Sequence, residues 1–133
     1  MSGKLIIGRP TLAMPPIAAV PYTGENAVLR LFRFNYGDAN PKNLINLPAG
    51  KNILRCEVVI EDAFNGNNPR LSVGTNANNE AIVVSSKILP SETGFYSFVS
   101  SFNQLTETSV LLFIFPNEGA TEGSGIISLL IER

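Results

Sequence analysis

Short apolar runs, separated by clusters of turn-forming residues, constrain the fold of this chain more than any other feature of the sequence. Beyond Gly24 the runs are about six residues long and begin roughly every 8 to 15 residues, which is the spacing of a β-sandwich or barrel. No segment keeps a 3.6-residue apolar repeat over three turns, so no helix is predicted; the best helical candidate, residues 101–109, is too polar and β-branched. The predicted strands cover residues 27–34, 53–61, 71–73, 81–86, 95–100, 110–115 and 126–131.

The clearest strand is residues 53–61, because apolar and charged side chains alternate along it. A period of two places alternate side chains on opposite faces of a sheet. One face is expected to be buried and the other exposed or at an interface. The buried set is Leu54, Cys56, Val58 and Ile60, and the opposite set is Arg55, Glu57 and Glu61.

Composition supports one domain built from these strands. The chain has 133 residues, of which 44% are hydrophobic, enough to fill one core, and 16% are charged, which argues against a disordered chain. The predicted fold class is all-β: a single antiparallel β-sandwich of the jelly-roll kind, with seven to eight strands, over residues 27–133. Residues 39–50 are predicted to be a polar connection containing a turn.

Residues 1–26 form a different kind of segment, predicted to be an extended N-terminal arm. Four prolines within twelve positions exclude a helix and favour a polyproline-like path. The arm is nevertheless apolar, unlike a flexible linker, and therefore needs a surface to lie on. That surface is either its own domain, with the arm as an edge strand, or a neighbouring subunit. The arm residues predicted to form a protein interface are Leu5, Ile6, Ile7, Leu12, Met14, Pro15, Pro16 and Ile17.

Net charge, the length of the apolar stretches and the cysteine content limit which partners and which compartment can be expected. A net charge of −1 gives no long-range attraction to nucleic acid or to an acidic membrane, and the basic residues are scattered. No apolar stretch approaches the roughly 18 residues of a membrane helix, and prolines interrupt the N-terminus where a signal peptide would need a continuous apolar run. A single cysteine fits synthesis in a reducing cytoplasm.

The sequence offers no catalytic machinery. It contains no histidine, which removes Ser–His–Asp and Cys–His catalysis and, with a single cysteine, the usual zinc sites. Cys56 lies on the predicted buried face and is expected to be an unreactive core residue. No catalytic residue, metal site or cofactor is therefore predicted.

Three further patterns have structural explanations. Glu61 and Asp62 are adjacent carboxylates, but neighbouring strand residues point to opposite faces. The oxygen-rich loops at Asp62–Asn67 and Asp38–Asn40 lack the spacing of a calcium loop and are typical turns. Gly123 and Gly125 precede a strand rather than a helix, so they are not a phosphate loop, and we expect them to form a flexible turn.

Short turn motifs give the chain a resemblance to a known class of proteins. The runs are Leu47–Pro48–Ala49–Gly50, Ala63–Phe64–Asn65–Gly66 and Pro69–Arg70–Leu71–Ser72–Val73–Gly74–Thr75. With the Gly-Ser-Gly turn before the last strand, they resemble small β-sandwich structural proteins of tailed bacteriophages over roughly residues 44–133. The resemblance implies a non-enzymatic virion component, either a capsid decoration (cement) protein or a head, tail or fibre accessory. It brings no catalytic residues.

The preferred hypothesis is a decoration protein, made in the host cytoplasm, that binds the major-capsid lattice as a symmetric oligomer, expected to be a trimer. Closed symmetry would bury the apolar arm and the unpaired sheet edges. A tail, baseplate or fibre subunit is the nearest alternative. A carbohydrate-binding jelly-roll module is the alternative of another class, although the chain has no Trp and only three Tyr to form sugar platforms.

Overall fold

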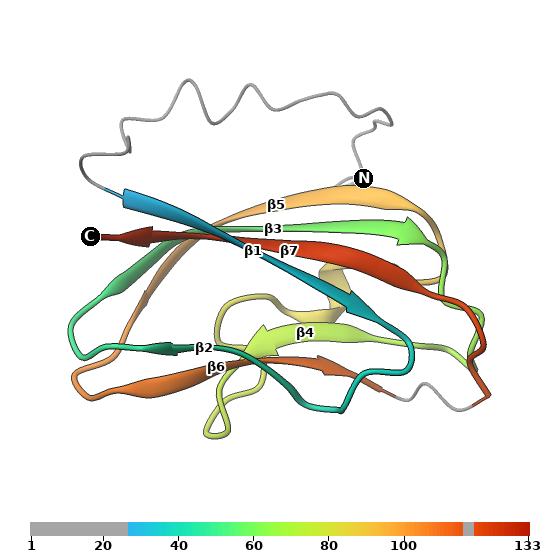
Figure 1. Ribbon diagram of the computed structural model, residues 1–133, viewed down its shortest axis with the longest axis horizontal. Helices are drawn as coiled ribbons and strands as arrows, with labels where there is room; N and C mark the ends of the chain where they lie inside the picture. Colours follow the sequence, from blue (N-terminus) through green and yellow to red (C-terminus); the bar gives the residue numbers. More distant parts are fainter. Residues whose placement is uncertain (1–26, 116–118) are drawn as a thin grey trace.

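The computed structural model describes residues 27–115 and 119–133, which form seven β-strands and one turn of 3-10 helix (Figure 1). Within these residues no helix is long and apolar enough to cross a membrane. The elements are β1 (Ala27–Asn35), β2 (Lys42–Leu47), β3 (Asn52–Asp62), β4 (Leu71–Gly74), η1 (Ser85–Lys87), β5 (Gly94–Asn103), β6 (Thr108–Ile114) and β7 (Ser124–Glu132).

The strands form two antiparallel sheets packed face to face, which confirms the predicted all-β sandwich (Figure 1). One sheet has the order β1-β7-β3-β5 and the other the order β2-β6-β4, so consecutive strands alternate between the sheets. This is the connectivity of a jelly roll, whose eight strands make two four-stranded sheets. In this chain no eighth strand pairs with β4; a single antiparallel bridge between Val73 and Val83 is formed there among the described residues.

The core lies between the two sheets and draws on every strand. Ile53, Val58, Val73, Val110 and Leu129 are all fully buried in it. At one end of the sandwich the rings of Phe34 and Phe64 stack with their centroids 6.0 Å apart. Burial of these apolar side chains is the main driving force for pairing the two sheets.

Strand β3 confirms most of the predicted pattern and corrects part of it. Cys56, Val58 and Ile60 are fully buried, as expected. Leu54 is only half-buried, because an irregularity in the pairing between Ile53 and Arg55 turns Ile53 into the core in its place. Glu57, predicted to be exposed or at an interface, is only 8% exposed.

Two segments differ from the prediction. Residues 42–47, expected to be a polar connection, form β2; a bulge between Asn43 and Ile45 buries Leu44 and Leu47 at a spacing of three, which hides the period-two pattern. Residues 81–86, expected to be a strand, make only the Val83 bridge and then enter η1. The other predicted strands are present, with bounds that differ by up to three residues.

Candidate interaction surfaces

The predicted interface residues of the arm, all between positions 5 and 17, lie outside the described residues, so the assignment remains a prediction. The same applies to the division between the arm and the sandwich.

Cys56 lies at the centre of β3 with no exposed surface. Burial, and to a lesser degree the negative charge of Glu57, raise the pKa of its thiol far above the ordinary value. A thiol that stays protonated and inaccessible is a poor nucleophile. The structure therefore agrees with the interpretation of Cys56 as a core residue.

The adjacent carboxylates at the end of β3 do not converge. Glu61 accepts a hydrogen bond from Arg33 Nη1 at 3.3 Å across the sheet, in an exposed ion pair. Asp62 instead accepts one from the Ser124 hydroxyl at 2.9 Å. Each carboxylate has its own partner, and the pair cannot act together on one bond.

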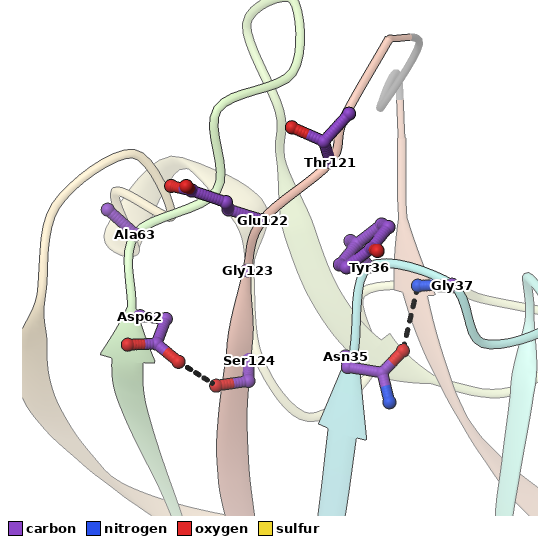
Figure 2. A pocket seen from close by; sticks show the side chains of 9 residues that line it. All are labelled: Asn35, Tyr36, Gly37, Asp62, Ala63, Thr121, Glu122, Gly123 and Ser124. Carbon is purple, nitrogen blue, oxygen red and sulfur yellow. Dashed lines mark hydrogen bonds between the residues drawn. The ribbon is translucent and has the colours of Figure 1, made fainter.

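A hollow of about 710 Å³ opens at this end of the sandwich, where β1 and β3 end and β7 begins (Figure 2). Tyr36, which is 44% exposed, lies on one side of it, and the bonded pair Asp62 and Ser124 lies on the other. No basic side chain is among the nine lining residues, so the hollow is unsuited to anions. The lining is Asn35, Tyr36, Gly37, Asp62, Ala63, Thr121, Glu122, Gly123 and Ser124.

The polar loop residues considered for calcium hold loops together. The side-chain oxygen of Asn65 accepts hydrogen bonds from the backbone N–H groups of Thr121 (2.9 Å) and Glu122 (3.0 Å). Asp38 accepts one from the backbone N–H of Asn35 and pairs with Lys42 at 3.4 Å. Within residues 27–115 and 119–133, no three Cys, Asp or Glu side chains gather in a group that could hold a metal ion.

Gly123 and Gly125 are not the flexible turn that the sequence suggested. Both are buried, and Gly125 lies inside β7. A Cβ at position 123 would collide with the Phe64 ring, and one at position 125 would collide with the Val59 carbonyl oxygen and the Phe34 ring. These glycines let the start of β7 approach the stacked aromatic pair, which is a packing role.

The solvent side of the β1-β7-β3-β5 sheet, called here the outer face, was not predicted from the sequence. Residues directly opposite each other in antiparallel pairs project to the same side, so the registers define three rows across the four strands. From β1 to β5 the rows are Leu29–Leu130–Arg55–Val99, Leu31–Ser128–Glu57–Ser97 and Arg33–Ile126–Val59–Phe95.

Apolar side chains mark the two edges of the outer face. Leu29 and Leu31 on β1 are 46% and 64% exposed, and Val99 on β5 is 81% exposed. Isolated apolar residues are common on protein surfaces; Leu29 and Leu31 are neighbours at one edge, and Val99 lies at the opposite edge. The alternation of Leu29, Leu31 and Arg33 along the sequence was the available signal.

A polar stripe crosses the middle of the outer face. Arg55 Nη1 donates to the Ser97 hydroxyl at 3.1 Å, and that hydroxyl lies 3.4 Å from Glu57 Oε2. Burial raises the pKa of the Glu57 carboxyl, although the charge of Arg55 and the Ser97 hydrogen bond lower it in part. Arg55 Nε is buried and has no hydrogen-bond partner. An unsatisfied buried donor is costly, and no acceptor within residues 27–115 and 119–133 reaches this one.

Comparison with known proteins shows similarity at the level of the fold. No protein-family model matches the chain, and no curated protein matches it in sequence. A chain in the cyanophage Pam1 capsid asymmetric unit superposes with a TM-score of 0.59 at 17% identity, covering 86% of this chain and 91% of that one.

A second solved structure gives the same picture. A chain from the acidic stable capsid structure of Helicobacter pylori bacteriophage KHP30 superposes with a TM-score of 0.51 at 15% identity. The match covers 80% of this chain and 87% of that chain. In both cases the match covers most of this chain and most of the other one.

Proposed function

We propose that the chain is a non-enzymatic component of a tailed-bacteriophage virion, and specifically a capsid decoration (cement) protein. The observation that carries this proposal is the match over nearly the full length of two chains that come from phage capsid structures. A small chain that is mostly one jelly roll suits attachment to the outside of a lattice better than construction of the lattice itself. The turn motifs in the sequence support the same class independently.

The proposed partners are other copies of the chain and the major capsid protein. A symmetric oligomer, proposed to be a trimer, presents several identical contacts to a symmetric lattice, so weak individual contacts add up to durable attachment. The location that follows is the capsid surface. A tail or fibre position is less favoured, because both matched chains belong to capsid structures.

The chemistry of the described residues supports a binding role. The one cysteine is buried, the adjacent carboxylates do not converge, and the chain contains no histidine. The surface has a sheet face with apolar edges and a hollow at one end of the sandwich, and both are features that can bind a partner.

The test is attachment to capsids. Particles assembled without the gene are mixed with the purified full chain, sedimented, and the bound copies are counted by quantitative mass spectrometry. We expect saturable binding, with a fixed number of bound chains in each symmetry unit of the capsid lattice. A chain found only in tail fractions, or one that does not bind capsids, would contradict the proposal.

The hollow favours a second candidate function, carbohydrate binding. An exposed Tyr36 ring beside amide, hydroxyl and carboxylate oxygens offers both stacking and hydrogen bonds to a sugar. Titration with a glycan panel, followed by NMR, would detect binding, and Tyr36→Ala should abolish it if the hollow is the site. Leu105→Ala, at another exposed position, is the control.

A further inference from the structure

Asn65 and Gly66 form the only Asn-Gly pair in the sequence, and they lie in the loop that follows β3. The side-chain amide of an asparagine can be attacked by the backbone nitrogen of the next residue. That nitrogen is least hindered when the next residue is glycine, because glycine has no Cβ. Asn65 is also exposed, so water reaches it. The pair therefore has the chemistry needed for deamidation, a spontaneous modification of the chain.

The fold holds the Asn65 side chain at both ends. Its oxygen Oδ1 accepts hydrogen bonds from the backbone N–H groups of Thr121 at 2.9 Å and Glu122 at 3.0 Å. Its nitrogen Nδ2 donates to the Thr121 hydroxyl oxygen at 2.9 Å, and its backbone N–H donates to the Glu122 carbonyl oxygen at 3.4 Å. These four bonds, called here the Asn65 clamp, join the loop after β3 to the segment that leads into β7.

The Asn65 clamp restricts the motion that deamidation needs. The Gly66 nitrogen must approach the side-chain carbon Cγ of Asn65 in a near-attack geometry, with the plane of the amide turned toward it. The three side-chain bonds of the clamp fix that plane. The reaction therefore depends on opening of the clamp, and local opening of a surface loop needs far less free energy than unfolding of the core.

We propose that Asn65–Gly66 is a spontaneous deamidation site that the Asn65 clamp restrains. When the clamp opens, the Gly66 nitrogen forms a bond to Asn65 Cγ and the bond from Cγ to Nδ2 breaks. Ammonia leaves and takes with it the proton of the Gly66 nitrogen. Water then opens the resulting five-membered ring at either carbonyl, which gives aspartate or isoaspartate at position 65. The reaction consumes only water.

The product weakens the clamp that restrained the reaction. A carboxylate at position 65 still accepts from the two backbone N–H groups, but it no longer donates to the Thr121 hydroxyl. It also adds a negative charge next to Glu122, and isoaspartate lengthens the backbone by one methylene. Because ammonia is lost to the solvent, the change is irreversible and accumulates with time. This inference goes beyond the proposed virion function and does not depend on it.

Peptide mapping by mass spectrometry measures the reaction at position 65. The full chain is incubated folded and in urea, in the same mildly alkaline buffer, and the fractions of asparagine, aspartate and isoaspartate are followed with time. We expect the folded chain to react at least about tenfold more slowly than the unfolded chain, because three side-chain hydrogen bonds must break first. Equal rates in the two states, or no reaction at position 65 in the unfolded chain, would overturn the proposal.

Thr121→Val tests the clamp itself, because it removes the acceptor of Nδ2 and keeps the shape of the side chain. We expect deamidation of the folded variant to be about two- to tenfold faster than in the parent chain, with an unchanged circular dichroism spectrum. The matched control is Ser124→Ala, which removes a hydroxyl that bonds to Asp62 and should leave the rate unchanged. An unchanged rate in Thr121→Val, or equal increases in both variants, would show that the clamp does not control the reaction. The comparison of folded and unfolded parent chain decides the proposal if Thr121→Val does not fold.

Discussion

Cys56 shows how burial can decide the chemistry of a side chain. It has no exposed surface, and burial raises the pKa of its thiol. We expect native protein to react with a thiol reagent many times more slowly than urea-unfolded protein. Cys56→Ala should lower the free energy of unfolding by about 1 kcal/mol, since it removes one buried sulfur atom. Rapid labelling of the native chain, followed by mass spectrometry, would contradict the assignment.

Glu57 predicts a pH dependence of stability. Burial raises the pKa of its carboxyl in the folded chain, so the folded chain binds the proton more tightly than the unfolded chain. Stability from this group is therefore full below the unfolded pKa, roughly 4.3, and is lost as the pH rises through the higher folded value. The residues paired with Glu57 on the flanking strands, Ser97 and Ser128, carry no charge. The charged group nearest to Glu57 on this face is Arg55, two residues away on the same strand.

Glu57→Gln keeps the shape and removes the titration. We expect the variant to be more stable than the parent chain near pH 8 and the difference to shrink towards pH 4, as measured by urea unfolding at a series of pH values. Glu61→Gln is the matched control, because Glu61 forms only an exposed ion pair with Arg33, worth about 0–1 kcal/mol. Parallel pH curves for Glu57→Gln and the parent chain would contradict the prediction.

At the scale of elements, Gly125 fixes how closely β7 lies against β3. A methyl group there would meet the Val59 carbonyl oxygen and the Phe34 ring, so Gly125→Ala should cost about 2–3 kcal/mol through overpacking. Gly50→Ala is the control: Gly50 has a φ of 79° but no heavy atom near its would-be Cβ, so only the left-handed backbone is penalised, by about 1 kcal/mol. Equal losses in chemical denaturation would refute the steric explanation.

Asn40 continues the pairing beside β6 through its side chain. Its amide nitrogen donates to the Ile114 carbonyl at 2.7 Å, and its oxygen accepts from the Ile114 N–H at 3.0 Å, as a paired strand residue would. Asn40→Ala should cost about 1–2 kcal/mol, because both backbone groups lose their partner. Asn40→Asp retains only the acceptor, so its melting temperature should fall between those of the parent chain and Asn40→Ala. If Asn40→Ala is as stable as the parent chain, water replaces the side chain.

The elements that could be predicted from the sequence are those with a regular side-chain pattern. Strand β3 was identified from its alternation, and the turn clusters separated most of the other strands. Strand β2 was missed because its bulge buries Leu44 and Leu47 out of phase. The expected strand at 81–86 competes with local bonds: the backbone N–H and hydroxyl of Ser85 both donate to Glu80, which lowers the Glu80 pKa and favours a turn.

The surfaces could not be predicted, because they depend on pairing between distant strands. Arg55, Ser97 and Leu31 lie on the same face of the sheet because of the registers that pair β1, β7, β3 and β5. The hollow likewise joins residues near position 36 to residues near position 122. Cross-strand registers of this kind are not encoded in the pattern of any single segment.

At the scale of the whole molecule, the described strands form two sheets around one core. The core cluster, from Phe34 to Ile131, lies between the two sheets. We therefore predict that deleting residues 1–21 leaves a folded β-domain, with an unchanged far-ultraviolet circular dichroism spectrum, but abolishes oligomerisation or capsid attachment. Five aliphatic arm residues buried at about 1.5 kcal/mol each give a gross gain of about 7 kcal/mol per arm before ordering costs.

A matched variant separates the side chains of the arm from its length. Replacing Leu5, Ile6, Ile7, Leu12 and Ile17 with Ser keeps all the prolines and the reach of the arm but removes the apolar surface. We expect this variant to behave like the deletion in light scattering and in capsid sedimentation, because the favourable term is burial of those side chains. If the serine variant still associates, these aliphatic side chains are not what holds the arm. If the deletion also stays oligomeric and binds capsid, the prediction that the arm lies on a neighbouring subunit is wrong.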